Sequence, residues 1–340
     1  MDYGNVESFE AKIIESVKKA KRKINDLRKE ETLVFPLFSD LHTDGKGHEF
    51  ANRLNFALKS ITEEIECDGI INLGDNFSML GRRIHITNDE LKKKFEELFS
   101  DIYSSTKLPV INVNGNHDAI GTDFFKSDFW NDIVKEKYGN KNAVYGDEGS
   151  YYYVDFEKSN TRFVILSLPY DSDIESQMPT PLWRFGKSQL EWLKNIALDT
   201  KNNVIILSHV PFFYKYMGDK QETMKVWDGK NEKLSYIFSL CGEIEDIDEA
   251  SKIINDFANL PETKLVAVLS GHIHEDDMWL PFEQRGKHKN PLSCKQIVTR
   301  GTCIGVRQEP QTGISVDVLI YTPKEEVNFV RIGDGADRNL

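Results

Sequence analysis

The sequence predicts an α/β fold in which helices flank two β-sheets, and three features of the 340-residue chain support this. Patterns of buried strands and amphipathic helices alternate over residues 33–113, as in parallel strands connected by helices. A second, less regular series of strands and helices follows, so a second sheet is expected. The composition, with 39% hydrophobic and 29% charged residues, is that of an ordinary globular protein.

The chain begins with a predicted amphipathic helix within residues 1–30. Its apolar residues recur every three or four positions, at Val6, Phe9, Ile13, Val17, Ala20, Ile24 and Leu27. One interpretation is a helix that packs on the main domain, and the alternative is a coiled-coil contact in a homodimer. We favour the first, because three heptads are the lower limit for a coiled coil.

The first half of the main domain predicts a β-α-β-α-β unit. Buried strands are expected at 33–38, 70–73 and 110–113, with a helix at 50–65 between the first two. The motif Thr87-x-x-Glu90 is a capping box that opens the second helix. Strands in such a unit run parallel, and their carboxyl ends are where α/β proteins bind ligands.

The second half predicts further strands around one capped helix. Segments 151–156 and 162–168 are expected to pair, and Ser188-x-x-Glu191 is expected to cap a helix. Buried strands follow at 203–207 and 265–269, and segments 314–320 and 327–332 predict a closing hairpin.

Charge and cysteine content restrict the class of partner and the compartment. The net charge of −12 disfavours nucleic acid and anionic lipid as partners, because both need a basic surface. No apolar run approaches the ~20 residues of a membrane helix. The first residues lack a secretory signal, and the four cysteines have no C-x-x-C spacing. We therefore expect reduced thiols, no membrane association and a cytoplasmic location.

Clusters of polar residues directly follow five predicted strands. They are Ser39-Asp40-Leu41-His42, Gly74-Asp75-Asn76, Asn114-Gly115-Asn116-His117-Asp118, Ser208-His209 and Gly271-His272-Ile273-His274. Because the strands' carboxyl ends share one edge of the fold, these clusters can meet despite spanning more than 230 residues.

The residue types in these clusters indicate a site for divalent metal ions. Two carboxylates, an amide oxygen and four imidazoles suit Mn, Fe, Co, Ni or Zn. Seven donors exceed the need of one ion, which suggests two ions with a shared carboxylate. Each residue alone could be a turn residue, a helix cap or a buried histidine, but their joint occurrence makes that interpretation improbable. The donors are Asp40, His42, Asp75, Asn116, His209, His272 and His274.

The order D-x-H, GD, GNHD, H and GHxH resembles the calcineurin-like metallophosphoesterases. The resemblance implies a four-layer αββα sandwich of two mixed β-sheets flanked by helices, formed by residues 31–340 with an insertion at about 212–262. Downstream of Asp75 the Asp-Arg-Gly of the protein serine/threonine phosphatases is absent, so the closest branch is the one that contains class III cyclic-nucleotide phosphodiesterases.

The resemblance also implies a role for each residue. Asp40, His42 and His274 would hold one metal ion, Asn116, His209 and His272 the other, with Asp75 bridging. A hydroxide that bridges the two ions would attack phosphorus. His117 would give a proton to the leaving oxygen or stabilise the charge that develops on it, and Asp118 would orient the His117 ring.

The expected function is the metal-dependent hydrolysis of a diester or monoester in a small phosphorylated substrate. A nuclease of the same fold would need a basic groove, which the net charge of −12 disfavours. A catalytically silent metal-binding scaffold would be expected to have lost donors, and all seven are present together with His117. A structural protein that dimerises through its N-terminal helix would bind no metal.

Overall fold

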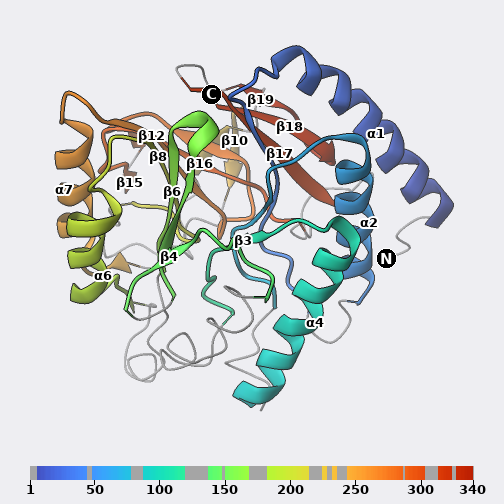
Figure 1. The fold of residues 1–340 in the computed structure, drawn as a ribbon, viewed down its shortest axis with the longest axis horizontal. Coiled ribbons are helices and arrows are strands. Elements are labelled where there is room, and N and C mark those ends of the chain that lie inside the picture. The colour runs from blue at the N-terminus through green and yellow to red at the C-terminus, as the bar shows by residue number, and fades with distance from the viewer. Residues whose placement is uncertain are drawn as a thin grey trace.

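Figure 1 presents the chain as a computed structural model. The structure describes residues 6–43, 48–77, 87–118, 137–147, 150–167, 182–213, 224–227, 232–235, 243–285, 288–302, 313–323 and 327–339. Two mixed sheets lie face to face at the centre, and helices cover the outer side of each (Figure 1). The predicted α/β fold of two helix-flanked mixed sheets is therefore confirmed.

The first sheet has the order β19-β18-β17-β1-β2-β3 among the described residues. Its strands are β1 (Leu33–Phe38), β2 (Ile70–Asn72), β3 (Val110–Asn112), β17 (Ser315–Tyr321), β18 (Val327–Gly333) and β19 (Arg338–Asn339). Strands β1, β2 and β3 are parallel, as the alternation of strands and helices predicted. Strands β17 and β18 form the expected antiparallel hairpin, and β17 pairs with β1.

The second sheet has the order β13-β16-β12-β8-β6-β5-β4 among the described residues. Its strands are β4 (Val144–Tyr145), β5 (Tyr152–Phe156), β6 (Thr161–Ile165), β8 (Asn203–Leu207), β12 (Lys264–Ser270), β13 (Asp277–Trp279) and β16 (Lys295–Val298). Strands β6, β8, β12 and β16 are parallel, whereas the predicted β5–β6 pair is antiparallel. Each sheet thus contains a block of parallel strands, and the carboxyl ends of the strands in that block lie at the same edge of the sheet.

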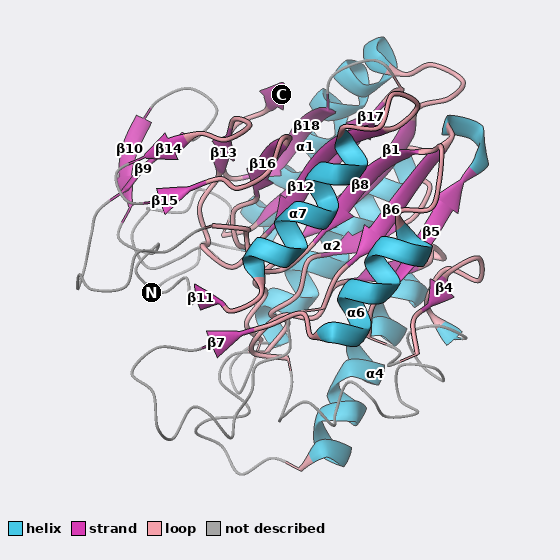
Figure 2. Cartoon of the chain, turned by 90° about the vertical axis from the view of Figure 1, so that its left-hand side faces the viewer, coloured by secondary structure: helices cyan, strands magenta, loops and turns pink. Residues whose placement is uncertain are grey.

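Three apolar layers hold the sandwich together. Leu33, Phe35 and Leu37 of β1 point into the layer between the sheets, while Val34 and Phe38 point to the outer helices. The outer helices of the first sheet are α1 (Val6–Leu27), α2 (His48–Glu64) and α4 (Asn88–Thr106). Those of the second are α6 (Lys187–Trp192), with a π-helical turn at Leu193–Ala197, and α7 (Ile247–Ala258) (Figure 2). Among the described residues, no helix combines the length and the apolar character that crossing a bilayer requires.

Helix α1 packs on the main domain, which confirms the first interpretation of its apolar stripe. Phe9, Ile13, Val17, Ala20 and Ile24 are all buried in the core of the first sheet. The helix contacts β18 and α2 of the same chain. A homodimer through this helix would have to use its outer face, and it stays a prediction.

The two predicted helix caps have different outcomes. Thr87 and Glu90 form the expected capping box at the start of α4. The cap at Ser188 is wrong, because α6 begins at Lys187 with Gly186 as its N-cap. Asp246 instead accepts hydrogen bonds from the backbone N–H groups of Phe185 and Gly186. A residue 60 positions away therefore organises this helix start, which no local motif could reveal.

The interval 212–262, expected as an insertion, includes part of the outer helix layer. Helix α7 packs against α6 and β12 and buries Ala250, Ile254 and Phe257 in the core of the second sheet. Four short strands in or beside this interval form small pairs: β9 (Met224–Trp227) with β10 (Glu232–Ser235), and β7 (Leu182–Trp183) with β11 (Glu243–Ile244). A further pair joins β14 (Gln284–Arg285) and β15 (His288–Lys289).

Replacement of Ile13 by Ala should destabilise the protein, because this α1 side chain is completely buried. We expect a loss of about 2–5 kcal/mol in the free energy of unfolding. The matched control is Ile14→Ala, because Ile14 is 41% exposed and should change stability by no more than about 0.5 kcal/mol. Urea unfolding measures both. Equal effects at the two positions would contradict the packing of α1 on the domain.

Candidate metal centre

The predicted metal-binding residues follow strands of both sheets. Asp40 and His42 follow β1, Asp75 follows β2 and Asn116 follows β3, all in the first sheet. His209 follows β8, and His272 and His274 follow β12, in the second sheet. The centre is therefore assembled from loops of two sheets that share no hydrogen-bonded ladder among the described residues.

Six of the seven predicted donors form two compact groups. The first consists of Asp40, His42 and His274, and the second of Asp75, His209 and His272; the donor atoms of each group lie within 4.8 Å of one another. In the first group, His274 Nε2 is 3.2 Å from Asp40 Oδ1 and 3.1 Å from His42 Nε2. In the second, His209 Nε2 is 3.1 Å from Asp75 Oδ2.

The carboxylate of Asp75 lies between the two groups. Besides its contact with His209, Asp75 Oδ2 is 4.0 Å from His42 Nε2, which belongs to the first group. The seventh donor, Asn116, has an Oδ1 atom that is buried and accepts no hydrogen bond from the described residues. A buried carbonyl oxygen without a partner is costly, and a cation would satisfy it. Carboxylate, imidazole and amide donors in this arrangement fit divalent ions.

Exposure divides the site into a closed base and an open side. The side chains of Asp40, Asp75 and His209 are at most 1% exposed. Those of His42, His117 and His274 are 17%, 23% and 27% exposed. A substrate can therefore reach the centre from the side on which His42, His117 and His274 are exposed.

The donor loops hold an unusual backbone conformation. Positive φ angles occur at five of the seven donors: Asp40 (52°), His42 (47°), Asp75 (55°), His272 (71°) and His274 (56°). Such angles are uncommon for residues other than glycine and persist only where the surroundings enforce them. Here the loops enforce one another, because Asp40 N–H donates to Gly74 O and His42 N–H donates to Asp75 O, at 2.8 and 3.1 Å.

Two motif glycines permit the close approach of neighbouring loops. A Cβ atom on Gly115 would lie 2.1 Å from the backbone nitrogen of Asp75. A Cβ atom on Gly271 would lie 1.9 Å from Ser39 Oγ and 2.8 Å from Asp40 Oδ2. These glycines are therefore part of the site, since a side chain at either position would displace a donor.

Electrostatics favour ionised carboxylates at the centre. Burial would raise the pKa of Asp75, but the imidazoles of His209 and His117 hold it well below its usual value. Burial would likewise lower the pKa of His209, but Asp75 and Asp40 raise it to about 9. His272 is different, because burial and the charge of His209 lower its pKa to about 3. Two carboxylates thus attract positive charge, which divalent ions would supply with release of protons.

The orientation of His209 is set by its own backbone contact. His209 Nδ1 lies 2.7 Å from Leu73 O, a carbonyl that only accepts, so Nδ1 carries the proton. Nε2 is then the nitrogen turned towards Asp75 and available to a metal ion. Asp40 is oriented similarly, since its Oδ2 accepts from Ser39 Oγ at 2.6 Å and from His272 N–H at 3.0 Å.

Asp118 makes contacts that the sequence analysis did not predict. Its completely buried carboxylate accepts hydrogen bonds from the backbone N–H groups of Asp75, Asn76 and Gly115, at 2.8, 2.7 and 3.0 Å. Asp118 therefore joins the loops after β2 and β3, and its expected role in orienting the His117 ring stays a prediction. His117 is placed by its own N–H, which donates to Asp75 Oδ1 at 2.8 Å. Burial and the nearby Asp75 raise the pKa of Asp118 to about 7.

A chain of buried amides beside the centre was missed by the sequence analysis. Asn72 Nδ2 donates to Asn76 Oδ1 and Asn112 Oδ1, at 2.9 and 2.7 Å. Asn112 Nδ2 donates to Asn114 Oδ1 at 3.3 Å, and Asn114 Nδ2 donates at 3.2 Å to Ser167 Oγ, just after β6 of the second sheet. The available signal was an asparagine inside the apolar runs of β2 and β3, because a buried amide needs partners.

Comparisons with known proteins agree with this geometry. The sequence profile described as calcineurin-like phosphoesterase matches residues 35–276. No curated protein matched by sequence. Among solved structures, the fold is similar to that of PhoD, with a TM-score of 0.52 and 12% sequence identity over 91% of this chain and 68% of that one. At this identity the likeness concerns the fold alone.

Replacement of Gly271 by Ala should weaken metal binding, because the new Cβ would displace Ser39 and Asp40. We expect a loss in affinity of at least the ~10–100-fold that changes around metal ligands cause. Titration with Mn²⁺ measures it. The double variant Gly271→Ala/Ser39→Ala should recover part of the affinity, since it removes the closest contact. Wild-type affinity in Gly271→Ala would show that the close approach is not required.

Proposed function

This chain belongs to the calcineurin-like phosphoesterase family, and we propose that it hydrolyses a phosphate ester, a diester or a monoester, with two divalent metal ions. The observation that carries the proposal is the close approach of the two donor groups, since Asp75 Oδ2 and Asp40 Oδ1 each lie within 4.0 Å of imidazoles from both. Bound divalent ions would supply a water nucleophile of lowered pKa and would neutralise charge on the phosphoryl oxygens.

Each residue then has a distinct task in the proposed reaction. Asp40, His42 and His274 would hold one ion, and Asn116, His209 and His272 would hold the other, with Asp75 available to both. His117 lies on the open side, with Nε2 3.8 Å from Asp75 Oδ2. From there it can protonate the leaving oxygen of an ester held over the centre. Asp118 acts indirectly, because its hydrogen bonds hold the loops that carry Asp75 and Asn116.

The proposed substrate is a small phosphorylated molecule. Two divalent ions beside the carboxylates of Asp40 and Asp75 leave the centre with a net positive charge. A chain with a net charge of −12 could therefore bind phosphate esters without a basic surface. A nucleic acid would need many more phosphate contacts than this centre offers.

The test compares two chromogenic esters. The protein is stripped of metal with a chelator, Mn²⁺ is restored, and hydrolysis of bis(p-nitrophenyl) phosphate and p-nitrophenyl phosphate is measured. Faster cleavage of the diester directs the search to diesters and cyclic nucleotides, and faster cleavage of the monoester directs it to phosphatase substrates. If the protein binds Mn²⁺ but hydrolyses neither ester, a catalytically silent metal-binding scaffold is favoured. A strongly salt-dependent DNA affinity would favour a nuclease.

Replacement of Asp75 by Asn should reduce activity more than the isosteric change Asp40→Asn. Asp75 is the proposed shared ligand, so its change would loosen both ions. Asp40 lies closer to His274 of its own group, at 3.2 Å, than to His209 of the other group, at 3.9 Å. We expect Asp75→Asn to lower the hydrolysis rate by more than the ~10–100-fold that changes around metal ligands cause, and to lose both ions. Hydrolysis rates and metal content measure the two variants. Equal losses of activity and metal would contradict the shared position.

Replacement of His117 by Ala should preserve metal content while turnover falls. Loss of a general acid costs about 10²–10⁴-fold in rate. The loss should be largest for esters with poor leaving groups, because these need the proton most. A series of aryl esters with rising leaving-group pKa measures it. If the variant loses metal instead, His117 is a ligand and the proposed role is wrong.

A further inference from the structure

Four charged residues form a buried network that the proposed reaction does not use. Asp317, Arg331 and Arg338 belong to β17, β18 and β19 of the first sheet. Asp276 lies in the loop between β12 and β13 of the second sheet, two residues beyond His274. All four are at most 6% exposed. Charges are buried to this extent only when they are paired.

Ion pairs in this network connect the two sheets. Arg331 Nε contacts Asp317 Oδ1 at 2.8 Å, and Arg331 Nη2 contacts Asp276 Oδ1 at 2.7 Å. Arg338 pairs with the same two carboxylates and is 3.2 Å from Asp276 Oδ1. Its Nη1 also donates to Val298 O of β16, at 2.9 Å. Two cations thus fix the loop after β12 to the end of the first sheet.

Asp276 also reaches the other loop of the first donor group. Its Oδ1 accepts from Arg300 N–H at 3.1 Å, at the start of the segment 300–302. In that segment Thr302 N–H donates to Ser39 O at 2.7 Å, and Ser39 Oγ donates to Asp40 Oδ2. Asp276 is therefore part of the loop that carries His274, and the segment 300–302 connects it to the loop that carries Asp40.

We propose that Asp276 is a positioning residue for the metal ion held by Asp40, His42 and His274. Its ion pairs with Arg331 and Arg338 keep the adjoining part of the loop in the strained conformation in which His274, two residues before Asp276, has a φ angle of 56°. Strain of this kind needs external support, and small displacements of donors weaken metal sites. The inference rests on the proposed two-metal function.

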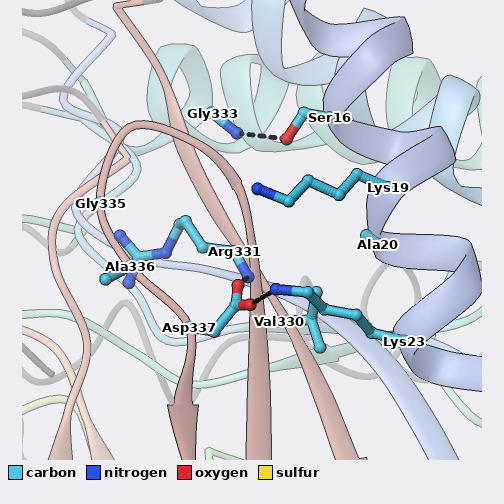
Figure 3. Close-up of a pocket in the computed structure, with 10 residues that line it drawn as sticks. All are labelled: Ser16, Lys19, Ala20, Lys23, Val330, Arg331, Gly333, Gly335, Ala336 and Asp337. Atoms are coloured by element: carbon cyan, nitrogen blue, oxygen red, sulfur yellow. Dashed lines mark hydrogen bonds and ion pairs between the residues drawn. The ribbon is translucent and has the colours of Figure 1, made fainter. Parts of the chain in front are cut away.

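The outer side of the network meets helix α1 at a pocket of about 310 Å³ (Figure 3). Figure 3 shows Lys19 and Lys23 of α1 opposite Arg331 and Asp337. Asp337 accepts from Arg331 N–H at 2.9 Å and pairs with Lys23. The Lys23–Asp337 pair is exposed, and Asp337 contacts Arg331 through its backbone N–H. Lys23→Ala is therefore a control for changes near the network that leave its four charges intact.

Two charge-balanced variants test the proposal. Asp276→Asn/Arg338→Met and Asp317→Asn/Arg338→Met each remove one buried carboxylate and one buried cation, and each retains one ion pair with Arg331. Mn²⁺ binding to the full chain is measured by equilibrium dialysis against a competing chelator, and stability of the metal-free chain by urea unfolding. We expect similar stability, but at least about tenfold weaker binding of one Mn²⁺ in the Asp276 variant only.

Asp276→Glu and Asp317→Glu keep all four charges of the network, and they replace the double variants if one of those does not fold. The longer side chain at Asp276 should shift the loop and weaken one Mn²⁺ site, whereas Asp317→Glu and Lys23→Ala should bind as wild type does. Equal weakening at Asp276 and Asp317, or none at Asp276, would overturn the proposal while leaving the metal centre standing. A wild-type chain that binds no divalent ion would overturn the proposed function as well.

Discussion

The proposed metal centre depends on the alignment of two sheets, because its seven predicted donors are divided between them. Asp75 of the first sheet and His209 of the second must meet at 3.1 Å, although no strand ladder joins their sheets in the described part of the chain. The apolar layer between the sheets, with Phe35 against Phe163, sets their separation. Apolar contact is non-directional and does not by itself prevent sliding. Directional polar contacts at the carboxyl ends of the strands therefore keep the two sheets aligned.

These contacts occur beside both parts of the donor set. The amide chain from Asn72 to Ser167 lies next to the loops of Asp75 and Asn116, and Thr302 binds Ser39 next to Asp40. The ion pairs of Asp276 adjoin the loop of His274. Buried polar groups are costly unless every partner is present, so such networks favour one register of the sheets over its neighbours.

Once the sheets are aligned, the conformation of the loops brings the predicted donors close to one another. Positive φ angles at five donors cost on the order of 1–3 kcal/mol each, and the surrounding contacts must offset this cost. The glycines at 115 and 271 allow those contacts, since the loops touch where a Cβ would stand. Without metal, the carboxylates of Asp40 and Asp75 are compensated by imidazoles, as the raised pKa of His209 shows. Divalent ions can therefore replace protons without a change of fold.

Local patterns determined much of this molecule. The α1 stripe, strand β1, the capping box at Thr87 and the order of the donor motifs were all predicted from residues a few positions apart, because helix and strand periodicity are local properties. Tertiary structure decided the rest. The contacts of Asp246 just before α6, the hydrogen bond from Asp75 to Asp118, the Asn72–Asn112 and Asn114–Ser167 links and the pairing of Asp276 with Arg331 join residues 40 to 61 positions apart. Such contacts depend on the register of strands and the packing of sheets, which no local pattern encodes.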